Sequence, residues 1–597
     1  MLARPASPAG APRAAPPDAP ADAPGPAGSV GPVVSVRSVP DAVVGHERAV
    51  RWVWADTASW YPRLLQDGTR VERCLDLRLT HRILRTSAAT AGSALARDVP
   101  GPFDLAAAAA VPGPVRPDGR QDTLFDADEP DEHGAAGGSD DAAPGVDACE
   151  RELAAQDAAV TGSTAPHRLR LLLVGESAGA LAAAEMQHTG LPWDVATHDA
   201  VLTDLLGPRP PRGERPALMA DLAARLRTAL DAPLLNPDSL PDVLRALRRQ
   251  GLPVTSTRSW ELREVDHPAI APLLAYKKLS RLHSANGWTW LDQWVPDGRF
   301  RPEYVVGGVV TGRWGSSGGG AQQIPRLLRS AVRADPGWRL VVADAAQLEP
   351  RVLAGLAHDE RMAAAGAGKD LYAGIVESGV VPERALAKVG MLGALYGGTT
   401  GASASVLPRL LQAYPRATGL VEEAARAGER GEVVSTLLGR SSPRPDAAWA
   451  QAQADALDPE ANEGAQSRAR ARTRAWGRFT RNFVVQGTAA EWALCWIAEL
   501  RRSLWAMGVD DDAPGLVRPP FQGRPHLVYF LHDELVVHCP ARHAGAVADA
   551  VVDAATTAGR RLFGDFPIEF PLSVGTAATY DAAKESAELR QGPAGRV

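Results

Sequence analysis

The first residue whose type and position suggest chemistry is a carboxylate at the end of an apolar run. Trp338 to Ala343 is apolar and β-branched, which predicts a buried strand, and Asp344 follows it directly. The apolar spacing from Leu348 to Leu356 predicts that a helix comes next. A carboxylate at a strand end is well placed to bind a metal ion, and the alternative is that Asp344 only caps this helix.

Two further carboxylates, Asp533 and Glu534, follow His532 between two apolar runs, residues 527–531 and 535–539, which predict a β-hairpin. A tight turn does not require Asp-Glu, because Asn-Gly would suit it better, although a solvated turn remains an alternative. Asp533 beside Asp344 would form a two-carboxylate site of the kind that Mg²⁺ occupies. Two such ions about 4 Å apart activate an attacking hydroxyl and stabilise a leaving pyrophosphate.

A predicted helix places two cations and two larger side chains at a spacing of four residues. Pro382 suits its start, and Arg384, Lys388, Leu392 and Tyr396 then share one slowly turning face. Two cations, an apolar side chain and a phenol on one face are suited to grip a triphosphate and then a base. A plain amphipathic helix is the alternative.

A second predicted helix is rich in arginine. Six arginines lie between Arg468 and Arg481, and Arg478, Asn482 and Gln486 again step by four residues. Phosphate backbones are held by arginine and by neutral amides of this kind. A solvated basic helix is the alternative.

In their order and spacing these stretches resemble the polymerase body of the family A DNA polymerases. The run from Val342 to Arg351 resembles motif A, which implies that Asp344 is a metal ligand and Glu349 a steric gate against the ribose 2′-hydroxyl. His532-Asp533-Glu534 resembles motif C, which implies that Asp533 is the second metal ligand and Glu534 a catalytic carboxylate that supports the metals. The implied cofactor is a pair of Mg²⁺ ions.

The same resemblance assigns the binding residues. Residues 384–397 resemble motif B, the fingers helix that receives the nucleoside triphosphate, and the stretch from Thr311 to Pro325 resembles a segment that touches primer and template. The residues implied to bind the nucleotide are Arg384, Lys388, Leu392, Tyr396, Glu349 and Gln347. Those implied to bind DNA are Arg313, Gln322, Arg351, Arg478, Asn482, Gln486 and His532.

Some positions depart from the family pattern. Ala345-Ala346 stands where motif A usually has Tyr-Ser, and Pro350 where it has an aliphatic residue. Leu392 replaces a usual aromatic of the fingers helix, and Tyr372 replaces a histidine that helps to hold the triphosphate. None of these changes removes a metal ligand or the Arg384/Lys388 pair, so they bear on catalytic efficiency.

The resemblance implies an α+β fold: a right-hand body with an antiparallel palm sheet and helical fingers and thumb. We expect this polymerase domain over 167–597, with the thumb at about 167–300 and the palm and fingers at about 300–597. Residues 1–32 are rich in Ala and Pro and predict a disordered tail. Residues 101–166 predict an acidic disordered linker, because the segment 118–157 carries a net charge of −11 and the rest of the chain +5.

Residues 33–100 resemble the 3′–5′ exonuclease-like α/β domain that precedes such polymerase bodies. An active exonuclease of this type requires about four carboxylates, including an Asp-x-Glu pair, which residues 33–60 lack. Asp56 and Asp76 match later motif positions only weakly. We therefore expect a degenerate domain without exonuclease activity, and a chain too short at its N-terminus for a 5′-nuclease domain.

A short peptide in the predicted linker suggests a protein partner. Gln121, Leu124 and Phe125 resemble the Gln-x-x-Leu-Phe peptide that docks bacterial polymerases on the sliding clamp, although so short a pattern also arises by chance.

The widely spaced cysteines form no Cys-x-x-Cys, which fits a reducing cytoplasm, and no apolar run is long enough to span a membrane. We thus expect a cytoplasmic, nucleoid-associated and monomeric DNA-templated DNA polymerase that binds primer–template DNA and dNTPs and acts in repair or gap filling. The alternatives are a primer–template binding protein with weak or lost catalysis, and an enzyme that retains 3′–5′ exonuclease activity.

Overall fold

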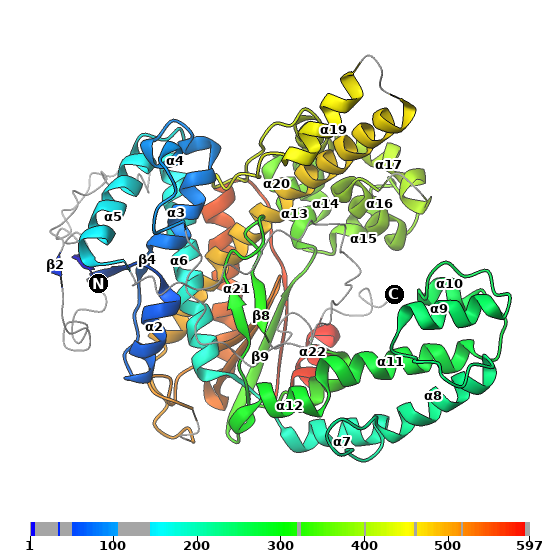
Figure 1. Cartoon of the computed structure of the whole chain (residues 1–597). Helices are drawn as coiled ribbons and strands as arrows, with labels where there is room; N and C mark the ends of the chain where they lie inside the picture. Colours follow the sequence, from blue (N-terminus) through cyan, green and yellow to red (C-terminus); the bar gives the residue numbers. More distant parts are fainter. Residues whose placement is uncertain are drawn as a thin grey trace.

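The computed structural model describes residues 50–104, 144–318, 324–398, 401–458, 462–514 and 517–590, together with the backbone of two short strands before residue 50. Its centre is a four-stranded antiparallel sheet in the order β10-β11-β9-β12. Helical groups lie above it, to one side and below it (Figure 1). The central strands are β9 (Trp338–Ala345), β10 (His526–Leu531), β11 (Glu534–Pro540) and β12 (Leu572–Ala577).

Strand β9 is buried on both faces over Leu340 to Ala343, as the apolar run there predicts. Leu340 and Val342 enter one hydrophobic core, whereas Val341 and Ala343 enter another. Successive side chains of a strand point to opposite faces, so this one strand joins both cores. The predicted strand is confirmed. Asp344 is the penultimate residue of this strand and does not belong to the helix that follows.

The predicted hairpin is confirmed as β10 and β11, with His532 and Asp533 between them. His532 takes a left-handed conformation with φ 56°, which the tight reversal requires. In the register of β11 on β9, Glu534 lies opposite Asp344, and the Ala345 amide donates to the Asp533 carbonyl at 2.9 Å. The tip of the hairpin therefore lies beside the end of β9.

A long helix, α20 (Glu463–Ala506), runs along the body. The sequence suggested two separate helices, 466–481 and 488–507, but the chain continues as one helix of 44 residues. Gly487 lies within this helix. A Cβ at this position would come within 2.4 Å of Thr436 Cγ2 and 3.1 Å of the Thr311 carbonyl oxygen. The glycine is thus required by close packing rather than by a break in the helix.

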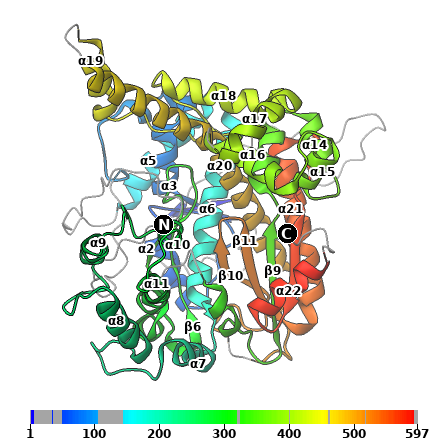
Figure 2. The same cartoon turned by 90° about the vertical axis from the view of Figure 1, so that its right-hand side faces the viewer.

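The helices fall into groups that Figures 1 and 2 show around the sheet. One group projects at the lower right of Figure 1 and covers the predicted thumb: α7 (Val195–Leu206), α8 (Ala217–Ala229), α9 (Leu240–Arg249), α10 (Ser259–Arg263), α11 (Ile270–Asn286) and α12 (Trp288–Trp294). The upper group is α13 (Leu348–Leu356), α14 (Glu360–Ala365), α15 (Leu371–Glu377), α16 (Arg384–Tyr396), α17 (Gly401–Ala413), α18 (Pro415–Glu429) and α19 (Ala447–Leu457). Helices α6 (Pro166–Thr189), α21 (Ala544–Phe563) and α22 (Tyr580–Arg590) complete the body, with the small pairs β5 (Leu191–Pro192)/β6 (Arg299–Phe300) and β7 (Glu303–Val305)/β8 (Gly315–Gly318). None of the described helices combines the length and apolarity that a bilayer crossing needs.

A small N-terminal unit packs on α6. Its sheet has the order β2-β1-β3-β4, and β3 pairs in parallel with β4. Its elements are β1 (Leu2–Pro5), β2 (Val34–Ser35), β3 (Val50–Trp54), β4 (Cys74–Asp76), α2 (Thr57–Gln66), α3 (Leu77–Thr86), α4 (Ala94–Arg97) and α5 (Val146–Thr161). It is fixed to the body by buried polar contacts: the Tyr61 hydroxyl donates to Glu185 at 2.6 Å, and Arg501 Nε donates to the same carboxylate at 2.7 Å.

Two expected boundaries are wrong. Residues 2–5 were expected in a disordered tail, but they pair along β3 through backbone groups, and the one proline of the strand, Pro5, stands at its end. Residues 146–161 were expected in the linker, but they form α5. Its Cys149, Leu153 and Val160 are buried because their helical spacing gives the segment an apolar face.

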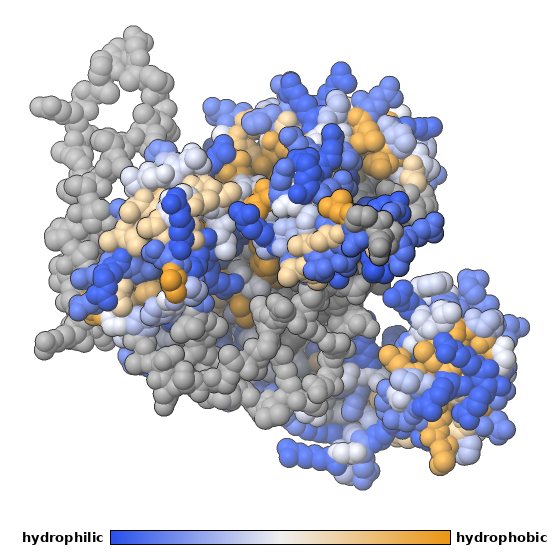
Figure 3. Space-filling view, turned by 45° about the horizontal axis from the view of Figure 1, so that its top comes forward, coloured by the Kyte–Doolittle hydropathy of each residue, from blue (hydrophilic) through white to orange (hydrophobic). Residues whose placement is uncertain are grey.

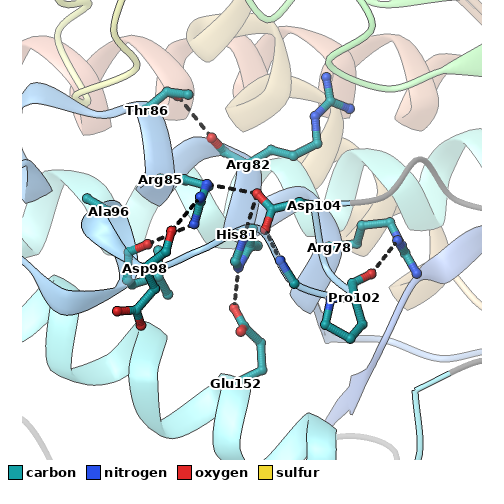
Figure 4. A network of polar contacts seen from close by, with 12 residues as sticks. Arg78, His81, Arg82, Arg85, Thr86, Ala96, Asp98, Pro102, Asp104 and Glu152 are labelled. Carbon is teal, nitrogen blue, oxygen red and sulfur yellow. Dashed lines mark hydrogen bonds and ion pairs between the residues drawn. The ribbon is translucent and has the colours of Figure 1, made fainter.

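A polar network holds α5 to this unit (Figure 4). His81 on α3 contacts Glu152 on α5 at 2.7 Å and Asp104 at 3.3 Å, and Arg85 Nε lies 2.8 Å from the same Asp104 carboxylate. Burial opposes the charged form of His81, but Glu152 and Asp104 outweigh it and raise the pKa of the imidazole. The network joins residues that precede 105 to a residue that follows 143, so α3 and α5 belong to the same folded unit.

Candidate active site

The predicted pair of carboxylates is brought together at the edge of the sheet. Asp344 is the penultimate residue of β9, and Asp533 lies at the adjacent hairpin tip. Burial, followed by the nearby Asp344 charge, raises the pKa of Asp533 to about 7. A cation placed between the two carboxylates would favour the charged form of Asp533.

Asp344 does not cap the helix that follows it. Helix α13 begins after Gln347, which is left-handed with φ 50°, and no side chain accepts from its first amides. The three residues between Asp344 and the helix therefore leave the carboxylate available. This observation excludes the capping alternative.

The residues at this edge fit Mg²⁺. The donors are carboxylate oxygens, and Mg²⁺ takes one or two carboxylates and fills its octahedral shell with water and phosphate oxygens. Across the residues that the structure describes, no group of three or more His, Cys, Asp or Glu side chains converges to form an all-protein metal cage. Asp344 and Asp533 are therefore suited to an open site that shares its metal with a substrate.

Two residues that sequence reasoning did not identify, Tyr580 and Lys584 on α22, lie at this site. Lys584 Nζ lies 2.8 Å from Asp344 Oδ2 and 2.6 Å from Glu534 Oε2, and the Tyr580 hydroxyl donates to Glu534 Oε1. Burial disfavours the ammonium, but Glu534 and Asp344 outweigh it and raise the pKa of Lys584. Their spacing of four residues was the available signal, although nothing in the sequence indicated its target.

Helix α16 presents its cations as predicted, but in different settings. Arg384 makes a bidentate contact with Asp370 at 2.7 and 3.2 Å, and Tyr372 lies under the guanidinium at 5.7 Å. The hydrogen bond to Asp370 raises the pKa of Arg384. Lys388, one turn further on, is exposed. The first cation is thus oriented by a partner, while the second is free to reach an anion.

Glu349, the predicted steric gate, links motif A to the fingers helix. It accepts from Arg313 and from the Tyr396 hydroxyl. A small pocket of about 60 Å³ lies here, and Arg313, Glu349, His532 and Asp533 are among the residues that line it. These four predicted site residues are therefore neighbours in space.

Gln347 and Arg351 are held within the protein. Gln347 Nε2 donates to Asp370 Oδ2 at 2.9 Å, so it connects motif A to the partner of Arg384. Arg351 is 0% exposed, and its guanidinium donates to the carbonyls of Ala346, Gly366, Lys369 and Glu569. The prediction that Arg351 contacts DNA is therefore wrong, because a guanidinium that saturates four backbone carbonyls inside the core joins loops instead.

The predicted DNA-contact residues of α20 lie along its surface. Arg478 is exposed and its stem packs on Gly397, the left-handed residue that ends α16. Asn482 and Gln486 are half-buried, and Leu392 of α16 is half-buried as well. Gln322 and the peptide residues Gln121, Leu124 and Phe125 lie outside the described residues.

In the N-terminal unit, the two carboxylates of the predicted exonuclease-like domain serve as helix caps. Asp56 accepts from the Ser59 amide at 2.7 Å, and Asp76 accepts from the amides of Leu79 at 2.9 Å and Thr57 at 2.7 Å. Both side chains are buried. Their oxygens are therefore engaged by backbone donors.

Comparison with known proteins gives a consistent result. A family model described as DNA polymerase family A matches residues 236–581. DNA polymerase I of Chloroflexus aurantiacus is 27% identical over 364 residues, which cover 56% of this chain and 34% of that protein. The thermostable DNA polymerase I of Thermus aquaticus is 27% identical over 393 residues, which cover 60% of this chain and 42% of that protein. The chain thus spans less than half the length of these relatives.

A solved structure shares the fold. The polymerase domain of Pol1 from M. smegmatis, in complex with DNA primer-template and dNTP, matches with a TM-score of 0.55 and 20% identity. The match covers 73% of this chain and 74% of that one. At this identity the likeness establishes the architecture of the body.

Proposed function

Because the chain belongs to DNA polymerase family A, we propose that it is a DNA-templated DNA polymerase that adds deoxynucleotides to the 3′ end of a primer. The observation that carries this proposal is the meeting of Asp344 and Asp533 at the sheet edge, beside the network that leads from motif A to α16. Primer–template DNA and dNTPs are the proposed substrates.

In the proposed mechanism the protein mainly positions reactants and neutralises charge. Asp344 and Asp533 would hold two Mg²⁺ ions, which when bound supply Lewis acidity at the primer hydroxyl and at the leaving pyrophosphate. Lys584 fixes the carboxylates of Asp344 and Glu534, so that both keep one orientation. The primer 3′-hydroxyl gives up its proton, and its oxygen forms a bond to the α-phosphorus. The bond between the α-phosphorus and the oxygen of the leaving pyrophosphate then breaks.

The remaining site residues are proposed to select and hold the nucleotide. Arg384, oriented by Asp370, and the exposed Lys388 carry the charge that the triphosphate requires. Tyr396 and Leu392 line the side of the base. Glu349, which accepts from Arg313 and Tyr396, is proposed to exclude a ribose 2′-hydroxyl.

We also propose that the N-terminal unit has lost 3′–5′ exonuclease activity. This proposal is supported by the use of Asp56 and Asp76 as helix caps. A monomeric enzyme that acts in repair or gap filling, and that uses Gln121, Leu124 and Phe125 to dock on the sliding clamp, completes the proposal. Calorimetry with the clamp tests the docking: Leu124→Ala with Phe125→Ala should abolish binding, and unchanged binding would refute it.

The deciding experiment is primer extension on a short primed template with Mg²⁺ and dNTPs. Wild type should extend the primer, and Asp344→Ala and Asp533→Ala should not. Extension by neither wild type nor variants, with DNA still bound, would instead favour a primer–template binding protein. A lane without dNTPs tests the N-terminal unit, because primer shortening there would contradict the loss of exonuclease activity.

A further inference from the structure

The N-terminal part of α20 extends beyond the body of the protein. At Gly477 the helix lies against α18, where an added Cβ would come within 2.7 Å of Glu429 Cγ, and α18 ends at that same Glu429. From Gly477 back to Glu463, α20 is accompanied by α19, and Gln453 donates to the Ala469 carbonyl at 3.3 Å. This part is about 21 Å long at 1.5 Å per residue. The pair projects at the top of Figure 1 and at the upper left of Figure 2.

The projecting part of α20 is strongly basic on its solvent side. Arg468, Arg470, Arg472, Arg474 and Arg478 are all exposed, and no acidic residue occurs between Glu463 and Glu491. Among the described residues none of these five guanidiniums has a carboxylate partner. The upper helices present a largely hydrophilic surface in the space-filling view (Figure 3).

A neighbouring arginine on the same helix shows the contrast. Arg481 is buried, pairs with Glu422 and donates to the Ala394 carbonyl at 2.9 Å. It is therefore a structural cation between α16, α18 and α20. Within the part of the chain that the structure describes, the five exposed arginines pair with no carboxylate, and Arg470 Nε donates to the Gln466 carbonyl of its own helix at 3.2 Å. An uncompensated row of this kind attracts a polyanion.

The row is continuous with the proposed DNA-binding residues. Arg470, Arg474, Arg478, Asn482 and Gln486 follow one another at intervals of four residues, and each step turns the stripe by only about 40°. The stem of Arg478 lies on Gly397, where α16 ends next to Tyr396. The stripe thus leads from the base side of the proposed active site out along the projecting helix.

An open cleft lies beside this stripe. It has a volume of about 420 Å³ and is lined by Arg470, Arg474, Gln453, Gln466 and Thr473, with Glu429 as its one carboxylate. Guanidinium, amide and hydroxyl groups are the side-chain donors that bind phosphate and sugar oxygens. The cleft is outside the carboxylate site and no part of the proposed reaction requires it.

We propose that this extension binds the single-stranded template ahead of the templating base, with Arg470 and Arg474 on its phosphates and Arg468 and Arg472 beside them. The proposal rests on the proposed polymerase function, because it takes the strand from the end of α16. We expect this surface to bind a single strand rather than a duplex. The pair formed by α19 and α20 is narrow and has one open cleft, which can follow one phosphate backbone.

The test compares two primer–templates that differ only in the 5′ template overhang, one very short and one of about 12 nucleotides, a length within the usual site sizes for single strands. Binding is measured by fluorescence anisotropy over a salt series. In Arg470→Ala/Arg472→Ala/Arg474→Ala, affinity for the long overhang should fall about 10-fold or more, and the salt slope should decrease by about 2, since each lost phosphate contact contributes about 0.7. Affinity for the short overhang should stay at the wild-type value.

The matched control is Arg151→Ala/Arg168→Ala/Arg560→Ala, which removes three exposed arginines from other elements and should leave both affinities unchanged. Alanine is the strongest helix former, so α20 should persist, and circular dichroism checks it. An equal effect on both overhangs, or no effect on either, would overturn the inference. If the wild type neither binds nor extends either primer–template, the proposed polymerase function itself is refuted. Wild type alone gives an independent reading, because affinity that does not rise with overhang length also contradicts the proposal.

Discussion

The two sheets of this protein use an aspartate at a strand end in opposite ways. In the N-terminal unit, Asp56 follows β3 and Asp76 ends β4, and each caps the helix that begins immediately afterwards. In the central sheet, Asp344 also stands near the end of a strand that leads to a helix, but α13 begins only after the left-handed Gln347. The carboxylate is therefore not engaged by the helix amides, and its Oδ2 lies 2.8 Å from the Lys584 ammonium instead.

The comparison shows that a strand–Asp–helix pattern does not identify a metal site by itself. The distance from the aspartate to the first helical amide decides whether its oxygens are consumed by the helix. A second carboxylate must also arrive from elsewhere. Asp533 reaches Asp344 from a distant hairpin. Asp56 and Asp76 also lie near each other, but they accept hydrogen bonds from the amides of the helices that they cap.

The largest expected effect separates the two kinds of aspartate by activity. Asp344→Asn and Asp533→Asn should each lower kcat/KM for dNTP addition by about 10³-fold or more, equivalent to about 4 kcal/mol of transition-state stabilisation. Asp56→Asn and Asp76→Asn should leave it near wild type, because asparagine also caps helices. Steady-state primer extension measures all four, and a comparable loss in Asp56→Asn would break the comparison.

A smaller effect is expected from the cations beside these aspartates. Lys584→Met should lower activity about 10- to 100-fold and raise the Mg²⁺ concentration needed, because the groups that orient metal ligands contribute effects of this size. Arg78, whose Nε lies 4.0 Å from Asp56 Oδ2, provides the matched control. Arg78→Met should not change the Mg²⁺ dependence, and a Mg²⁺ titration of the extension rate distinguishes the two variants.

The cap at Asp76 should also have a signature in the pH dependence of stability. Burial raises the pKa of Asp76 from 3.8 to about 6. The folded state therefore binds the proton more tightly than the unfolded state, so this group's contribution to stability falls as the pH rises from about 4 to about 6, by up to about 3 kcal/mol. Urea unfolding at several pH values should show this fall in wild type and not in Asp76→Asn. Parallel curves for the two proteins would contradict the assignment.

The smallest expected effect concerns the cap itself. Asp56→Ala should lower the free energy of unfolding by about 1 kcal/mol, whereas Asp56→Asn should lower it by a few tenths or less. Asp344→Ala removes no cap and should change it by less than Asp56→Ala does. Thermal unfolding of the three variants ranks them, and equal losses in Asp56→Ala and Asp344→Ala would remove the distinction.

Much of the site was predictable because it is written in local patterns. The apolar run of β9, the hairpin around His532-Asp533-Glu534 and the four-residue spacing on α16 each report a local structure that the chain then forms. The same spacing marked Arg478, Asn482 and Gln486 as one stripe of α20. These features depend on side-chain periodicity, which a sequence displays directly.

Other features depend on contacts between distant residues, which local patterns do not display. The burial of Arg351 follows from four backbone carbonyls on three loops that meet around it, and no spacing in motif A indicates it. Lys584 is 240 residues from Asp344, so its place between Asp344 and Glu534 depends on how α22 packs against the sheet.

The sequence by itself indicated the central strand, the hairpin and the helices that carry the candidate carboxylates and cations. The tertiary structure alone decided which of those groups are engaged in contacts within the protein and which can contact a ligand. The physical reason is that a buried polar group must find a partner, and the partner is chosen by packing across the whole chain. Backbone amides donate hydrogen bonds to Asp56 and Asp76. The register of β11 on β9 places Asp344 beside Asp533.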